Sequence, residues 1–269
     1  MFAKLKYIFC RISDLFSKII FPPGKLKIRQ VKVNNCQLLV CSNETVGRQL
    51  SWNGGYERAE SKFIADSIKS TDICLDVGAN IGYYTFLMAS RALKGQVHSF
   101  EPIPLCYHLL QSSIYLNNFV NITVNNCAVG EEGNKVPFFI AKDSAFSSLQ
   151  NSQENDLAKK IDVQVITIDE YLSSKSISKV DFLKIDVEGA EMTVVNGASK
   201  LLNDANRRPR IMMLELCEHH LKDFSCNVKS VIDVLKLHGY HAKILKNNKL
   251  LHYNAEDSLT NYNIFFTLF

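Results

Sequence analysis

The sequence lacks the cysteine and histidine patterns that stabilise small secreted proteins or bind structural metal ions. Its eight cysteines include no C-x-x-C pair, and none of its seven histidines stands at a zinc-ligand spacing from a cysteine or another histidine. We therefore predict neither a disulfide framework nor a zinc site. Cys74 and Cys217 lie in apolar runs, which is typical of buried thiols in a reducing compartment, so we expect a cytoplasmic protein.

Strong charge of one sign and internal repeats are also missing. The 31 basic and 27 acidic residues leave a net charge of +4, and the basic residues are scattered along the chain. A nucleic-acid-binding protein normally gathers them into a stripe, so we expect no nucleic-acid partner. With 46% hydrophobic and 22% charged residues, the composition predicts a globular chain with one main domain.

Residues 1–21 are predicted to form a basic amphipathic helix. Apolar residues recur there at helical spacing from Phe2 to Ile19, with lysine and arginine between them. These charges argue against a transmembrane span, and the small-residue cleavage site of a signal peptide is absent. Two interpretations stay open. The helix packs on its own domain or on a second subunit, which we favour, or it makes peripheral contact with the inner surface of an anionic membrane.

Residues 26–33 and 37–41 have the pattern of two strands joined by a turn at Asn34 and Asn35. We expect this hairpin to extend or cover an edge of the main sheet. The chain is accordingly divided into an N-terminal extension over residues 1–52, made of the helix and the hairpin, and a main domain over residues 53–269. The sequence does not indicate whether the protein is a monomer or an oligomer.

The main domain is organised around residues 72–101, which have the pattern of strand, glycine turn, helix and strand. The turn contains Gly78, Asn80 and Gly82, which tolerate a sharply bent backbone that a ligand can approach closely. The second strand ends at Glu101, 19 positions after Gly82. A carboxylate at that place can bind both ribose hydroxyls of a nucleoside. The layout predicts a nucleoside-containing cofactor bound to a parallel α/β sheet.

The spacing of this turn favours a cationic cofactor over a dinucleotide. A dinucleotide site has the pattern G-x-G-x-x-G, whereas this turn has an acidic residue before its glycines, at Asp76. Its carboxylate would repel a pyrophosphate and attract the sulfonium of S-adenosylmethionine. The adenine is expected beside the residues that follow the strand predicted over residues 122–124. The predicted cofactor-binding residues are Asp76, Gly78, Asn80, Gly82, Tyr83, Glu101, Asn126, Ala128 and Asp186.

The densest group of acidic residues follows the strand predicted over residues 181–187. Asp186 and Glu188 lie at its end, and Glu215 ends the next parallel strand, shortly before His219. Because the carboxyl ends of parallel strands meet at one edge of a sheet, we predict that these four residues form the catalytic group. Asp186 is our first candidate for the general base and His219 the second. Although three carboxylates could hold a magnesium ion, no ligand loop accompanies them, and we predict no metal.

Two motifs make the sequence resemble the FkbM family of S-adenosylmethionine-dependent methyltransferases: LDVGANIGYYT at residues 75–85 and KIDVEGAE at residues 184–191. The resemblance covers roughly residues 55–240. It implies a Rossmann-like sheet of seven strands with helices on both faces, whose last two strands are antiparallel at the far edge. It also implies methyl transfer to a hydroxyl group of a sugar, glycan or natural product. In such sequences a Tyr-Glu pair often precedes the turn, which would place Tyr56 and Glu57 at the cofactor pocket, and residues 147–149 resemble a small family motif.

Two other functions stay open. A nicotinamide-dependent oxidoreductase would share the fold, but it would have glycine in place of Asn80 and would lack the KIDVEGAE motif. A non-catalytic, membrane-associated binding protein would explain residues 1–21, but it would not need carboxylates at the ends of several strands.

Overall fold

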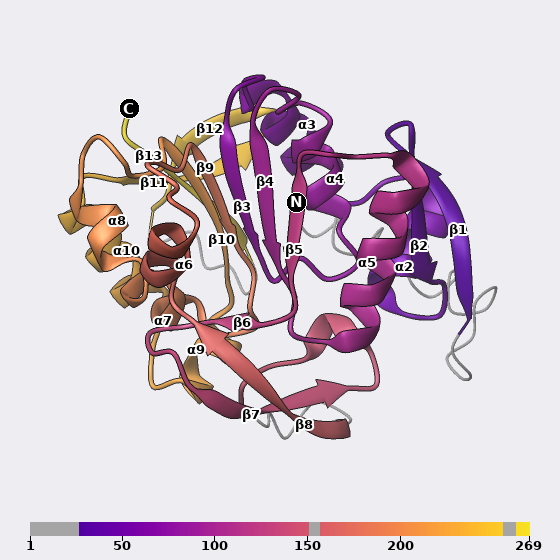
Figure 1. Cartoon of the computed structure of the whole chain (residues 1–269). Helices are drawn as coiled ribbons and strands as arrows, with labels where there is room; N and C mark the ends of the chain where they lie inside the picture. The colour runs from indigo at the N-terminus through magenta and orange to yellow at the C-terminus, as the bar shows by residue number, and fades with distance from the viewer. Residues whose placement is uncertain (1–26, 151–156, 255–261) are drawn as a thin grey trace.

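The computed structural model describes residues 27–150, 157–254 and 262–269, which form an open α/β sheet with helices on both faces (Figure 1). The main sheet has eight strands in the order β12-β11-β13-β10-β9-β3-β4-β5. Strands β5, β4, β3, β9 and β10 are parallel, and β13 runs antiparallel between β10 and β11. The bounds are β3 Ile73–Val77, β4 Gln96–Phe100, β5 Ile122–Asn125, β9 Phe182–Ile185, β10 Ile211–Leu216, β11 His241–Lys246, β12 Lys249–His252 and β13 Tyr262–Thr267.

This topology confirms the predicted Rossmann-like sheet, including the last strand between its two neighbours. The expected number of strands was too low by one, because β12 adds a strand at the far edge. It pairs with β11 through a turn at Asn247 and Asn248, which have left-handed φ angles of 51° and 59°. Two asparagines in this conformation form a tight hairpin turn, so the signal was present in the sequence.

Successive residues of the central strands alternate between two apolar cores. Cys74 and Phe182 belong to the core on one face, and Leu75 and Leu183 belong to the core on the other. The first core is covered by α3 Arg58–Ser67, α4 Tyr83–Ala89 and α5 Pro104–Asn117. The second is covered by α6 Ile168–Ser174, α7 Glu191–Asn196, α8 Ser199–Asn203, α9 Glu218–Asp223 and α10 Val228–Leu237. Because both faces are covered, a charged side chain in a central strand needs a partner inside the protein.

The predicted hairpin is present as β1 Ile28–Val33 and β2 Cys36–Cys41, but its expected place at the main sheet is wrong. The two strands form a separate sheet. Strand β2 lies against helix α5, where the Leu39 amide donates to Ser113 Oγ at 2.9 Å and the Gln37 amide donates to Asn117 Oδ1 at 2.7 Å. Side chains of α5 thus satisfy amides that a neighbouring strand would otherwise have to pair.

Helix α2 Thr45–Asn53 follows the hairpin and was not predicted. Its N-cap residue, Glu44, makes no side-chain capping hydrogen bond, so the usual start signal is missing. The helix packs so closely on the end of β2 that a Cβ at Gly47 would lie 2.1 Å from the Cys41 carbonyl oxygen. Residues 1–21 lie outside the described residues, so both interpretations of that segment remain predictions. No helix in the described ranges is long and apolar enough to cross a membrane.

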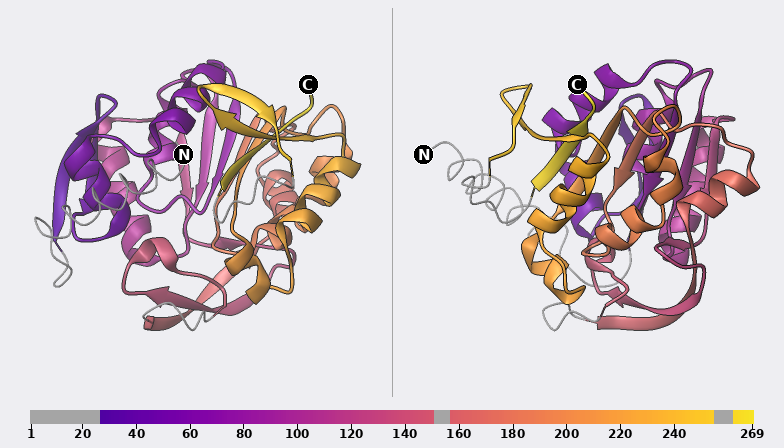
Figure 2. Two further views of the ribbon diagram at one scale, coloured as in Figure 1. Left: turned by 180° about the vertical axis from the view of Figure 1, so that it is seen from behind. Right: turned by 90° about the vertical axis from the view of Figure 1, so that its left-hand side faces the viewer.

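A second, three-stranded sheet lies across one end of the main sheet (Figure 2). It consists of β6 Ala128–Val129, β8 Leu157–Ile166 and β7 Lys135–Ala141, in that order, and β7 is followed by the short 3-10 helix η1 Ser144–Phe146. The sequence pattern predicts an inserted strand pair over residues 135–141 and 162–168, and the structure has this pair with its second strand starting earlier, at Leu157. Strand β8 ends at Ile166 because Thr167 and Glu170 form a capping box that starts α6.

The sequence pattern predicts a single helix over residues 188–202, but the structure has a turn followed by two short helices, α7 and α8. Glu188 and Gly189 have left-handed φ angles of 53° and 105°, which a right-handed helix does not allow. A Cβ at Gly189 would lie 2.5 Å from the His220 carbonyl oxygen. The turn therefore packs directly on α9, another helix that was not predicted, and brings Glu188 beside His220.

Candidate active site

A cavity opens at the carboxyl ends of β3, β4, β9 and β10. Strand β3 lies between β4 and β9, and the chain connections that follow these two strands run on opposite faces of the sheet. Open α/β sheets bind their ligands where the connections change face in this way. One side of the cavity is formed by residues 78–81 of the glycine turn, by Tyr83 and Tyr84, and by Glu101. Asp186 and Glu188, which follow β9, and Glu215, near the end of β10, form another side. The inserted sheet, η1 and α2 close it with Thr45, Val46, Phe138, Ser144, Ala145, Phe146, Ser147 and Leu149.

The glycine turn has the tight geometry that its sequence predicts. Gly78 has a φ of 77°, and its amide donates to the Phe100 carbonyl oxygen at 3.1 Å. A Cβ at Gly78 would lie 1.8 Å from the Asp186 carbonyl oxygen, so only glycine lets the ends of β3 and β9 approach each other. Gly82 does not line the cavity. It has a φ of 90°, and a Cβ there would lie 2.2 Å from Leu110 Cδ1.

Glu101 is held in the cavity wall by backbone amides. Its Oε2 accepts from the Asn80 amide and its Oε1 accepts from the Ile103 amide, both at 2.7 Å. Burial raises the pKa of Glu101 to about 7, although both hydrogen bonds favour the ionised form. Each carboxylate oxygen retains a second lone pair, so Glu101 can accept both hydroxyls of a ribose. Glu101 therefore lines the cavity as a carboxylate suited to a ribose, and its contact with the cofactor remains a prediction.

Asp76 lies behind the cavity wall and not in it. It is fully buried, and its Oδ2 accepts from Thr85 Oγ1 at 2.6 Å. Its Oδ1 lies 3.8 Å from Lys184 Nζ. The expected direct contact of Asp76 with a cofactor therefore gives way to a contact with Lys184, because Asp76 is needed to neutralise a buried ammonium group.

Lys184 connects Asp76 with the acidic group. Its side chain is 3% exposed, and Nζ donates to Asp186 Oδ2 at 2.9 Å. Nζ also lies 5.3 Å from the centre of the Tyr84 ring. Burial lowers the pKa of Lys184, but Asp186 and Asp76 more than reverse this effect and raise the pKa above its usual range. Lys184 is therefore a charged residue in a covered strand, fixed by two carboxylates.

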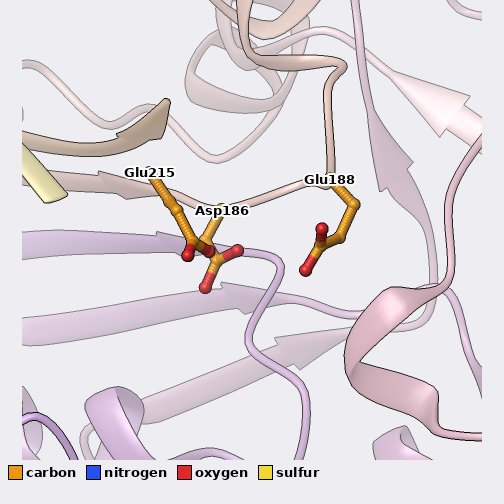
Figure 3. A group of neighbouring side chains, drawn as sticks. All are labelled: Asp186, Glu188 and Glu215. Atoms are coloured by element: carbon orange, nitrogen blue, oxygen red, sulfur yellow. The ribbon is translucent and has the colours of Figure 1, made fainter. Parts of the chain in front are cut away.

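The three predicted carboxylates of the catalytic group do lie together (Figure 3). One oxygen each of Asp186, Glu188 and Glu215 lies within 4.8 Å of the other two, and all three residues line the cavity. Two unit charges at that distance repel each other by roughly 3 kcal/mol at an effective dielectric constant of about 20. Such repulsion favours a proton on one of the carboxyl groups.

The three carboxyl groups have different surroundings, which shift their pKa values in different directions. Burial alone raises the pKa of Asp186, but Lys184 and a hydrogen bond from Glu215 hold it below its usual range. The charge of Asp186, followed by burial, raises the pKa of Glu215 well above its usual range. Burial raises the pKa of Glu188, against the opposing effect of His220, whose Nδ1 lies 2.7 Å from Glu188 Oε2. At neutral pH the structure therefore favours an ionised Asp186 and a protonated Glu215.

The imidazole that reaches this group belongs to His220, whereas the sequence indicated His219. The hydrogen bond to Glu188 raises the pKa of His220. His219 is exposed on α9 and is not among the residues that line the cavity. Helix α9 has six residues and no side-chain cap, so the sequence could not show which of two adjacent histidines would face the acidic residues.

The remaining predicted residues divide between the cavity and its support. Tyr83 and Ala128 line the cavity. Asn126 does not, because its exposed side chain turns back to donate to the Glu101 carbonyl oxygen at 2.8 Å. The resemblance implied Tyr56 and Glu57: Tyr56 lines the cavity, while Glu57 lies behind Tyr84 and accepts from its hydroxyl at 2.5 Å.

Glu57 is nevertheless part of the same charged region. Its φ of 40° is left-handed, which is strained for glutamate. Besides the Tyr84 hydroxyl, its carboxylate accepts from Asn263 Nδ2 at 2.9 Å, on the strand beside Glu215. Burial raises the pKa of Glu57 to about 7. The inserted loop reaches this region too, since Ser148 Oγ donates to the Glu188 carbonyl oxygen at 2.9 Å.

The residues present fit S-adenosylmethionine. Glu101 suits its ribose, the apolar wall at Ile103 and Ala128 suits its adenine, and the carboxylates beside the turn suit its two cationic groups. Among the described residues, Asp186, Glu188 and Glu215 are the group whose geometry could also hold a metal ion. Because Lys184 and His220 already neutralise two of these carboxylates, we retain the prediction of no metal.

The strand order and the position of the cavity are those of the Rossmann-like methyltransferases that use S-adenosylmethionine. The chain belongs to the FkbM methyltransferase family, since the family described as "Methyltransferase FkbM domain" matches residues 76–242, more than half of its length. This match confirms the family that the two sequence motifs indicated.

Several known proteins are similar to the chain. Methyltransferase sdnD of Sordaria araneosa is 24% identical over 163 residues, which cover 50% of this chain and 63% of that protein. The 31-O-demethyl-FK506 methyltransferase FkbM of Streptomyces tacrolimicus is 24% identical over 201 residues, covering 64% and 74%. Hexuronic acid methyltransferase AglP of Haloferax volcanii is 24% identical over 199 residues, covering 73% and 79%. The match thus spans less than two thirds of sdnD. Among solved structures, M. jannaschii TYW2 in complex with AdoMet has a TM-score of 0.48 and 12% identity, covering 90% of this chain and 85% of that one.

Proposed function

We propose that the protein transfers the methyl group of S-adenosylmethionine to a hydroxyl oxygen of a sugar, a glycan or a natural product. The observation that carries this proposal is the shared cavity, in which the carboxylates of Asp186, Glu188 and Glu215 face the same space as Glu101. Groups able to accept a proton therefore lie beside a ribose-binding carboxylate. The names of two relatives, which refer to 31-O-demethyl-FK506 and to hexuronic acid, agree with an acceptor that carries hydroxyl groups.

In this reaction, different residues of the chain would bind the cofactor, position the acceptor and exclude water. S-adenosylmethionine supplies a methyl group that is already activated by its sulfonium. Glu101 and the glycine turn hold the nucleoside, and Lys184 fixes the Asp186 carboxylate, which accepts a hydrogen bond from the acceptor hydroxyl. Removal of the hydroxyl proton by a carboxylate of the acidic group contributes roughly a hundred- to ten-thousand-fold to such a step, and it requires a hydroxyl held in place. The walls formed by α2, η1 and the inserted sheet limit the access of water.

The experiment uses S-adenosylmethionine with a labelled methyl group and a panel of a neutral sugar, a uronic acid and a polyhydroxylated macrocycle. We expect label on a hydroxyl oxygen of at least one acceptor. Asp186→Asn keeps the shape of the side chain and removes its charge, so turnover should fall at least about a hundredfold while cofactor affinity changes little. Asp66→Asn, an exposed carboxylate on α3, is the matched control.

Calorimetric titration separates the alternatives. Binding of NAD without binding of S-adenosylmethionine would support the oxidoreductase and contradict the proposal. A labelled product methylated on nitrogen or carbon would retain methyl transfer but overturn the hydroxyl acceptor. Normal turnover in Asp186→Asn would remove Asp186 from the reaction and leave it as a partner that keeps Lys184 charged.

A further inference from the structure

The carboxylates at the acidic side of the cavity outnumber the cations that face them. Asp186 comes from β9, Glu188 from the following turn and Glu215 from β10, while Glu57 precedes α3, and Asp76 and Glu191 approach from β3 and α7. Within the described ranges the facing cations are Lys184, which contacts Asp76 and Asp186, and His220, which contacts Glu188. The tyrosines of this region, Tyr56 and Tyr84, stay neutral because burial raises their pKa values.

Glu57, Glu191 and Glu215 have no cation partner among the described residues, and of these three Glu215 is the one that lines the cavity. It also lies within 4.8 Å of Asp186 and Glu188. A proton shared with Asp186 removes one of the like charges and satisfies an oxygen of each group. The direction of the pKa shifts, upward for Glu215 and downward for Asp186, agrees with this placement of the proton.

We propose that Glu215 stores the proton of the reaction: it is protonated in the empty cavity, ionises when the sulfonium cofactor binds, and receives the proton of the acceptor hydroxyl during methyl transfer. This inference rests on the proposed function and adds the destination of the proton. Asp186, held by Lys184, then remains ionised throughout and orients the hydroxyl, so it is Glu215 whose charge changes.

The proposal balances charge and atoms at each step. A sulfonium entering the cavity adds one positive charge, and loss of the Glu215 proton to solvent compensates for it. During transfer the bond between carbon and sulfur breaks with its electron pair left on sulfur, which becomes a neutral thioether, and the methyl carbon bonds to the acceptor oxygen. The hydroxyl proton moves to the Glu215 carboxylate. The cavity thus loses the sulfonium charge and gains a proton, so its net charge is unchanged.

A measurable difference between two cofactor forms follows, and it requires no acceptor. S-adenosylmethionine carries the sulfonium, whereas S-adenosylhomocysteine carries a thioether in its place. The first should displace about one proton more than the second. Because release of a proton is favoured at higher pH, the ratio of the two affinities should shift toward S-adenosylmethionine by up to about tenfold per pH unit while Glu215 is protonated in the empty protein. Ionisation of Glu101 acts equally on both ligands, since both contain the ribose.

The test is calorimetric titration of the full chain with each ligand, in two buffers of different ionisation enthalpy. The difference between the two heats gives the number of protons released. Each ligand has an amine that titrates on its own, so the decisive quantity is the extra release that Glu215→Gln removes. We expect about one extra proton in the wild type, nearly none in Glu215→Gln, and the wild-type value in Glu132→Gln, a matched change at an exposed residue. Equal proton release in the wild type, or an unchanged excess in Glu215→Gln, would overturn the proposal.

A second measurement covers the case in which Glu215→Gln does not fold. The infrared carbonyl absorption of protonated carboxylic acids in the empty wild-type protein should fall by about one more group on adding S-adenosylmethionine than on adding S-adenosylhomocysteine. An equal fall with both ligands counts against proton storage. Failure of either ligand to bind would instead contradict the proposed function, so the two failures are distinguishable.

Discussion

The two sides of the cavity neutralise their carboxylates in different ways. On the glycine-turn side, Glu101 receives hydrogen bonds from the backbone amides of Asn80 and Ile103. On the acidic side, Asp186 and Glu188 depend on the side chains of Lys184 and His220. Backbone amides neither titrate nor leave, whereas side-chain partners can exchange protons. The glycine-turn side therefore presents a carboxylate with fixed partners, whereas the acidic side presents carboxylates whose charge can change.

The largest effect, a loss of free energy of unfolding, is expected from replacing Lys184 on the acidic side. Lys184→Met retains the length of the side chain but leaves Asp76 and Asp186 without their buried cation. Removing one partner of a buried ion pair costs about 3–5 kcal/mol. Lys179→Met is the matched control, because Lys179 also contacts an aspartate two residues later, Asp181, at 2.8 Å, yet its side chain is 53% exposed. An exposed pair contributes at most about 1 kcal/mol.

Denaturant unfolding of the two variants, monitored at neutral pH, checks this expectation. Equal losses in Lys184→Met and Lys179→Met would mean that the acidic side does not depend on its buried cation. The contrast between the two sides of the cavity would then lose its physical basis.

Gly78 joins the two sides, and Gly78→Ala is expected to have the next largest effect. The new methyl group would meet the Asp186 backbone oxygen at 1.8 Å, in addition to the cost of a φ of 77° for alanine. Together these effects should lower the free energy of unfolding by about 3 kcal/mol and weaken cofactor binding. Gly54→Ala isolates the backbone cost, because Gly54 has a φ of 62° and nothing lies within 4 Å of its added Cβ. That control should lose only about 1 kcal/mol. Thermal unfolding that gives the same loss for both would rule out the close approach of β3 and β9.

The glycine-turn side was the more predictable from sequence. Its function depends on residues close together in the chain, and conformations such as those of Gly78 and Asn80 require particular residue types. The strand that ends at Glu101 was predictable for the same reason, since its apolar pattern is local. The side chain of Asp76 was misplaced because only the paired strands bring Lys184 beside it.

The acidic side depends on contacts between distant elements, which a single sequence does not encode locally. Glu188 meets His220 because a left-handed turn packs on α9, and Glu57 reaches Asn263 across 206 positions. The walls of the cavity were missed for a similar reason. Thr45 of α2 donates through Oγ1 to Asp143, the N-cap residue of η1, at 2.7 Å, and α2 itself has no side-chain cap. Composition and strand ends predicted that carboxylates would gather there, but not which cations would accompany them.

Glu101→Ala, a change on the glycine-turn side of the cavity, is expected to have the smallest effect, and this effect is measured on ligand binding. Loss of a charge-assisted hydrogen bond to the ribose should weaken S-adenosylmethionine and S-adenosylhomocysteine alike by about 1.5–3 kcal/mol. Because the pKa of Glu101 is about 7 in the empty protein and the ionised carboxylate is the better acceptor, affinity for both ligands should fall as the pH drops below 7. Glu101→Ala should abolish that part of the pH dependence but leave the difference between the ligands, which we attribute to Glu215. Calorimetry over pH 6–8 measures both quantities, with Glu101→Gln as the variant that retains shape without charge. Unchanged affinity in Glu101→Ala would mean that the ribose lies elsewhere, and a loss confined to one ligand would mean that the two sides of the cavity do not act separately.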